Sequence, residues 1–85
     1  MQMDEKEELK QELQQELQWV QYRQKILDIM KEKLLQMKQL ARKAKQANLT
    51  AGELEEINAR LNNLATQVRA LDVESRRTED GKILE

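Results

Sequence analysis

The chain has 85 residues, of which 36% are charged, and its formal net charge is −1 at pH 7. It contains no cysteine, histidine or proline, which excludes disulfides, thiolate chemistry and the commonest acid–base and metal-binding side chain. No apolar run approaches the roughly 20 residues that a membrane span requires. Lys, Glu, Gln, Leu and Ala dominate, and because these residues favour helices, the composition predicts an all-α, coiled-coil-like protein.

The first predicted helix covers residues 4 to about 47, a stretch with nothing that interrupts a helix. Apolar residues recur in it at steps of three and four, and from Val20 onward the pattern is a heptad in which Arg23 is the only polar occupant. This heptad predicts the residues that face a partner helix. They are Leu27, Met30, Leu34, Met37, Ala41 and Ala44.

Further apolar residues widen this stripe beyond what one neighbouring helix covers. We expect them to form a surface for self-association or for a protein partner. They are Leu13, Leu17, Trp19, Tyr22, Ile26, Ile29 and Leu35. Trp19 and Tyr22 suit an interaction hot spot, or they close the open end of the core.

The boundary between the two helices is marked by several agreeing signals. Asn48 suits a helix C-terminus, and Thr50 with Glu53 three residues later forms a capping box. Leu49 and Leu54 are placed to form a hydrophobic staple across the helix start. We therefore predict a turn at residues 48–50.

The second predicted helix runs from residue 51 to about 75 and has an uninterrupted heptad seam. Its core residues are Leu54, Ile57, Leu61, Leu64, Val68 and Leu71. A connection this short makes the helices antiparallel neighbours, so the expected fold is a two-helix hairpin. In the expected register Leu34 faces Leu64, and the seam ends where Arg23 faces Ser75.

Three regions follow from this pattern. Residues 1–19 form an acidic, Gln/Glu-rich helical overhang with six acids and two lysines, a balance of −4. Residues 20–77 form the hairpin, and the part from 20 to 49 has eight bases and two acids, a balance of +6. Residues 78–85 are expected to be a flexible tail, of which 84–85 resemble the scar of a purification tag.

Nothing in the chain forms a catalytic or metal-binding motif. Glutamates such as Glu12 and Glu16 lie one helical turn apart, but no Glu-x-x-His accompanies them, so a solvated face is the favoured interpretation. We expect no enzyme activity, cofactor or metal. A basic row from Lys31 to Lys45 suits nucleic acid or an anionic membrane, but the net acidic chain and the scarcity of aromatic residues disfavour both.

The stretch from about residue 26 to 71 resembles the helical hairpin in the N-terminal half of the filament-core domain of bacterial flagellin. The residues that carry the resemblance are Ile26, Leu27, Met30, Leu34, Met37, Leu40, Ala41, Ala44, Thr50, Ile57, Leu61, Leu64, Val68 and Leu71. The resemblance implies a hairpin whose open face accepts further helices, in a flagellum-associated or secreted structural protein. Convergence of two heptad hairpins is the alternative interpretation.

The expected function is therefore a structural or adaptor module that acts through its helix faces. We expect a homodimer or a helical protein partner, and no nucleic acid, membrane or small-molecule substrate. An export chaperone or regulator that binds a client protein is the alternative. The expected location is the cytoplasm, or outside the cell by a route without a signal peptide if the flagellin resemblance reflects common ancestry.

Overall fold

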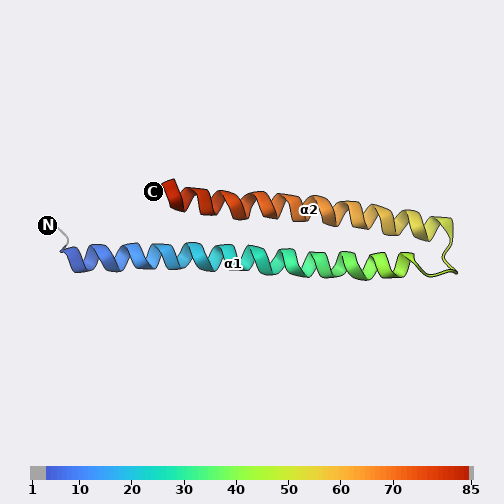
Figure 1. Ribbon diagram of the computed structural model, residues 1–85, viewed down its shortest axis with the longest axis horizontal. Helices are drawn as coiled ribbons and strands as arrows, with labels where there is room; N and C mark the ends of the chain where they lie inside the picture. The colour runs from blue at the N-terminus through green and yellow to red at the C-terminus, as the bar shows by residue number, and fades with distance from the viewer. Residues whose placement is uncertain (1–3, 85) are drawn as a thin grey trace.

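The computed structural model describes the backbone of residues 4–84 and the side chains of residues 4–77. Within this range the chain forms two helices, α1 (Glu5–Ala44) and α2 (Ala51–Leu84), which lie antiparallel along their length (Figure 1). The molecule is a rod with extents of 72 × 17 × 17 Å. The predicted all-α helical hairpin is confirmed.

Each helix begins at a polar side chain that satisfies free backbone N–H groups. The Asp4 carboxylate accepts a 2.8 Å hydrogen bond from the backbone N–H of Glu7. At the start of α2, the Thr50 hydroxyl accepts from the backbone N–H of Glu53 at 3.1 Å, and the Glu53 carboxylate accepts from the Thr50 N–H at 3.5 Å. The expected capping box is therefore present, and it starts α2 where the sequence indicated.

Helix α1 ends at Ala44, three residues before the predicted end, so the prediction that Asn48 terminates it is wrong. The backbone N–H groups of Lys45 and Gln46 donate to the carbonyls of Arg42 and Lys43, which tightens the last turn. The connection between the helices therefore consists of residues 45–50.

Helix α2 extends further than predicted, to Leu84 rather than about residue 75. Residues 78–84 are therefore helical, in contrast to the expected tail, and Glu85 lies outside the described residues along with residues 1–3. Because α2 has 34 residues and α1 has 40, α1 projects past the end of α2 only at its N-terminus (Figure 1). The overhang is thus shorter than the expected 19 residues.

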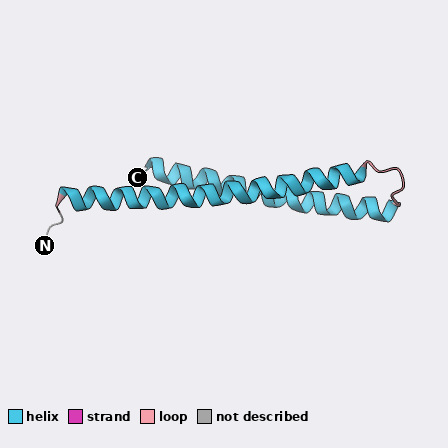
Figure 2. Cartoon of the chain, turned by 90° about the horizontal axis from the view of Figure 1, so that it is seen from below, coloured by secondary structure: helices cyan, strands magenta, loops and turns pink. Residues whose placement is uncertain are grey.

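The two helices cross at a shallow angle, as heptad seams require (Figure 2). The centre of their contact is formed by Ile26 on α1 and by Ile57 and Leu64 on α2, which are 5%, 5% and 9% exposed. Half-buried residues continue the contact on both sides. They are Trp19, Met30, Lys33, Met37, Leu40 and Ala44 on α1, and Leu61, Ala65, Val68, Leu71 and Asp72 on α2.

On α1 this seam differs from the predicted one by a rotation of the helix. The predicted core residues Leu27, Leu34 and Ala41 are exposed, and Ile26, expected in an outer surface, is the most buried residue of α1. On α2, Leu54 also lies more open than predicted. The row of Ile26 and the row of Leu27 lie on either side of the row of Met30, Met37 and Ala44. Heptad periodicity alone therefore fits a seam that contains either of these two rows. The structure buries the row that contains Trp19, Ile26, Lys33 and Leu40.

Polar residues also take part in the seam that the structure selects. Lys33 occupies the buried row and is half-buried, as a lysine can be because its long aliphatic stem packs on apolar surface. Ser75, 4% exposed, continues the heptad of Leu61 and Val68 one step beyond the predicted end. Among the residues with described side chains, no buried polar atom lacks a hydrogen-bond partner.

Candidate functional site

A row of exposed apolar residues follows α1 on one side of the seam. Its members recur every seventh residue, which keeps them on one line along a helix in a coiled coil. We call this set the α1 row, and it consists of Leu13, Val20, Leu27, Leu34 and Ala41. The four large side chains are 39–57% exposed, Leu27 being the least and Leu13 the most exposed.

The α1 row remains open because α2 covers only the adjacent side of α1. From Val20 onward, each row member directly follows a residue of the buried row in sequence, as Leu27 follows Ile26, and is therefore turned by about 100° from it. One neighbouring helix covers a stripe of limited width, and here the stripe ends before the α1 row. The hairpin therefore presents a line of exposed apolar side chains, one in every seven residues, to its surroundings.

Two further leucines extend this line sideways. Leu17 lies one turn from both Leu13 and Val20, and Leu35 directly follows Leu34; both are more than half exposed. In heptad position both lie on the side of the α1 row away from α2. Single exposed apolar side chains are common on protein surfaces, but a patch extended along several turns is typical of an interaction site.

The residues predicted for partner binding divide into three groups in the structure. Leu13, Leu17 and Leu35 are exposed beside or within the α1 row, as expected for a binding surface. Tyr22 and Ile29 are also exposed, but in heptad position they lie on the opposite side of the seam. Trp19 is half-buried and Ile26 is buried against α2, so the predicted role of Ile26 in an outer surface is wrong.

Sequence reasoning missed Val20, Leu27 and Leu34 as surface residues because it placed them in the hairpin seam or its extension. Their heptad spacing was visible in the sequence, but the same spacing fits a buried seam equally well. A signal that could have separated the two rows is side-chain size at two positions, since Trp19 and Leu40 are larger than Val20 and Ala41.

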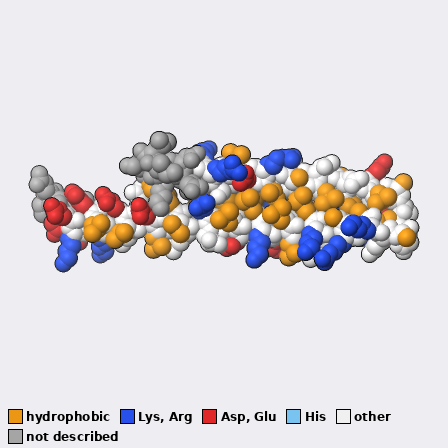
Figure 3. Space-filling view, viewed as in Figure 1, with side chains coloured by type: hydrophobic (Ala, Val, Ile, Leu, Met, Phe, Trp, Pro, Cys, Tyr) orange, Lys and Arg blue, Asp and Glu red, His pale blue; other side chains and the backbone are white. Residues whose placement is uncertain are grey.

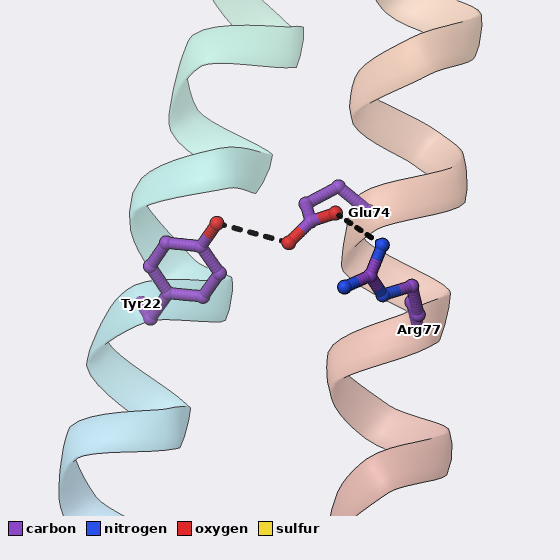
Figure 4. A network of polar contacts seen from close by, with 3 residues as sticks. All are labelled: Tyr22, Glu74 and Arg77. Carbon is purple, nitrogen blue, oxygen red and sulfur yellow. Dashed lines mark hydrogen bonds and ion pairs between the residues drawn. The ribbon is translucent and has the colours of Figure 1, made fainter.

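A polar network connects the helices on the side of the seam opposite the α1 row (Figure 4). The Tyr22 hydroxyl donates a 3.1 Å hydrogen bond to one carboxylate oxygen of Glu74. The other oxygen lies 3.9 Å from Nη1 of Arg77. The hydrogen bond to Glu74, together with desolvation and the carboxylate charge, raises the pKa of Tyr22 above 10.0, and Arg77 opposes this shift.

The network also fixes the register of the hairpin. Tyr22 lies across from Glu74, within one turn of the expected register in which Arg23 faces Ser75. The backbone of α2 continues as a helix past Glu74 to Leu84, so this contact lies before the end of the hairpin. With one hydrogen bond and one ion pair between exposed groups, the network positions the helices rather than supplying most of their stability.

Charge is distributed unevenly along α1. Residues 4–19 carry six acids and two lysines, whereas residues 20–45 carry eight bases and two acids. Figure 3 shows acidic side chains gathered at the N-terminal end of the rod and basic side chains along the flank of α1 towards the turn. The apolar line of α1 is therefore accompanied by negative charge at one end and positive charge at the other.

The described residues offer no arrangement of groups typical of catalysis. Within them no cluster of three or more acidic side chains has the geometry to hold a metal ion. Neither helix, as far as it is described, has an apolar stretch long enough to cross a membrane. The chemistry that the described surface supports best is apolar contact with another helix.

No protein-family model, no curated protein and no solved structure matches the chain.

Proposed function

We propose that this protein is a structural or adaptor module that acts by associating with itself through the exposed side of α1. The observation that carries the proposal is the α1 row. Four large aliphatic side chains at heptad spacing remain 39–57% exposed on a hairpin that has already formed its own seam. Fully burying such a side chain contributes about 1.5–3 kcal/mol, so covering this row stabilises an assembly of hairpins.

The small size of the hairpin strengthens this argument. A chain of 85 residues in two helices buries little surface, and only three apolar residues with described side chains are less than about a tenth exposed. Association with a second copy would add a second apolar contact to the small one between α1 and α2. The flagellin resemblance, which covers about residues 26–71, suggests a class of setting for such a module: a flagellar or secretion-associated assembly built from packed helical hairpins.

Analytical ultracentrifugation over a range of protein concentrations tests the proposal. We expect the chain to sediment as a dimer that dissociates on dilution, and we expect Leu27→Glu to weaken the association at least about tenfold, because it sets a charge in the middle of the apolar contact. Gln39→Glu is the matched control, since Gln39 is an exposed α1 residue outside the α1 row. A well-folded monomer at high concentration would overturn the proposal.

A chaperone or regulator that binds a client helix is the second candidate. It is favoured by the N-terminal part of α1, where a shallow groove is lined by Lys6, Leu9, Lys10, Leu13, Gln14 and Leu17. Four acids from Asp4 to Glu8 lie at the start of this segment, which suits a client with basic and apolar residues. The two functions differ in the purified chain, since a client-binding protein remains monomeric alone and a self-associating module does not.

A further inference from the structure

We infer that two hairpins pair with their α1 helices antiparallel, through the α1 row, about a two-fold axis at Leu27. This inference rests on the proposed function and specifies its partner, a second copy of the chain, and its geometry. An antiparallel pair of α1 helices would place each α2 on the same side of the new contact. The result is a four-helix arrangement, which is how apolar stripes wider than one seam are commonly buried.

The spacing of the α1 row supports this geometry. Leu27 is the third of five members, with two members at seven-residue steps on each side. Antiparallel pairing about Leu27 therefore sets Leu27 against its own copy, Val20 against Leu34 of the second copy, and Leu13 against Ala41. Every member of the row gains a counterpart, and the most exposed leucine meets the smallest side chain.

The charge of α1 selects the antiparallel direction. Residues 4–19 have a balance of −4 and residues 20–45 a balance of +6. In an antiparallel pair centred on Leu27, Glu12 and Glu16 lie level with Arg42 and Lys38 of the second copy, on the other flank of the contact, so segments of opposite net charge lie at the same level at both ends. A parallel pair in register would align acid with acid and base with base, which is unfavourable along the whole contact.

The two leucines beside the row agree with the same pairing. Leu17 and Leu35 lie on the same side of the α1 row, the side away from α2. In an antiparallel pair about Leu27, this side of one helix faces the same side of the other. Leu17 then lies within two residues, or about 3 Å along the axis, of the level of Leu35 in the second copy. The pairing thus brings together exposed leucines that α2 leaves uncovered.

Disulfide trapping distinguishes this geometry from the alternatives, because the chain contains no cysteine. Single cysteines are placed at Leu27, Val20 and Leu34 in separate full-length variants, which are oxidised in a thiol–disulfide buffer and resolved by mass. We expect Leu27→Cys to form a linked homodimer, and a mixture of Val20→Cys and Leu34→Cys to form the mixed dimer. Glu32→Cys, on an exposed face away from the row, is the control that we expect to remain unlinked.

The Val20→Cys variant alone provides the decisive comparison. In the antiparallel pair its two copies are about 21 Å apart along the axis, whereas a disulfide requires Cβ atoms about 3.5–4.5 Å apart, so we expect loss of the linked homodimer. Efficient linking of Val20→Cys to itself would overturn the inference in favour of a parallel pair. A dimer by ultracentrifugation without trapping at any of the three row positions would overturn it while leaving self-association intact. A monomer would overturn both.

Discussion

At the residue scale, the contact between Tyr22 and Glu74 is the clearest polar connection between the helices. Tyr22 is the only tyrosine of the chain, so its ionisation can be followed without interference. Its pKa is raised because the hydroxyl donates a hydrogen bond to a carboxylate, and ionisation would break that bond and set two negative charges together. The tyrosine therefore reports whether this contact between the helices is formed.

We expect Tyr22 to titrate above 10.0 in the folded chain and to return to about that value in denaturant, as measured by tyrosinate absorbance. Because the folded-state pKa lies above the unfolded one, the associated stability is complete below pH 10 and is lost as the pH rises through the folded pKa. Glu74→Gln should lower the pKa, and Arg77→Gln should raise it further. An unchanged pKa in Glu74→Gln would show that the hydrogen bond is not formed in solution.

Thr50 is the second residue with a testable local role. Its hydroxyl accepts from the backbone N–H of Glu53 and donates to the Glu53 carboxylate, both at 3.1 Å. Thr50→Ala removes this cap and should destabilise the hairpin by about 0.5–2 kcal/mol in urea denaturation followed by circular dichroism. Thr50→Ser retains the hydroxyl and should change stability much less; an equal loss in both variants would contradict the capping role.

At the scale of the elements, α1 carries two apolar rows and α2 occupies one of them. The buried row contains Ile26, and the α1 row contains Leu34 at half exposure. The rotation that separates them is one residue, about 100°, and both rows share Met30 and Met37 as neighbours. The choice of row determines which residues stabilise the hairpin and which remain for association.

Two alanine substitutions distinguish these roles. Ile26→Ala should destabilise the hairpin by about 2–5 kcal/mol, because it opens a cavity in the seam. Leu34→Ala should change the stability of the dilute monomer by no more than about 0.5 kcal/mol, since it removes an exposed side chain. Its effect should grow with protein concentration, because it weakens association. The opposite ranking in dilute solution would show that α2 packs on the α1 row.

At the scale of the whole molecule, the separation of charge along α1 governs how rods orient against each other. Like charges alongside each other disfavour one direction of pairing, and opposite charges favour the other, although each exposed pair contributes only about 0.2–1 kcal/mol. Exchanging charges on α1 should therefore change the preferred direction of association strongly and change the stability of the single hairpin only slightly.

Charge-exchange variants test this expectation by ultracentrifugation. We expect Glu12→Lys with Glu16→Lys to weaken self-association several-fold, and Lys38→Glu with Arg42→Glu to do the same, because each makes α1 more uniform in sign. A mixture of the two variants should associate more strongly than either alone, since opposite charges then align at both ends. High salt should remove this gain. A mixture that behaves as the average of its components would contradict antiparallel pairing.

The features that local chemistry specifies were predictable from the chain alone. Thr50 and Glu53 are three residues apart and satisfy each other, so the start of α2 required no knowledge of the rest of the fold. The same holds for the all-α class, the reversal of the chain and the seam of α2 around Ile57 and Leu64, because each follows from helix propensity and three-to-four spacing.

Other features depend on contacts between distant segments. The sequence did not indicate that α1 ends at Ala44. The continuation of α2 through Gly81 shows that a single glycine, which weakens a helix by about 1 kcal/mol, does not end it. The rotation that buries Ile26 and exposes Leu27 and Leu34 arises from packing against α2. A heptad pattern predicts that apolar rows exist. Which row is covered depends on how the side chains fit across the seam, and that fit exists only when both helices are packed together.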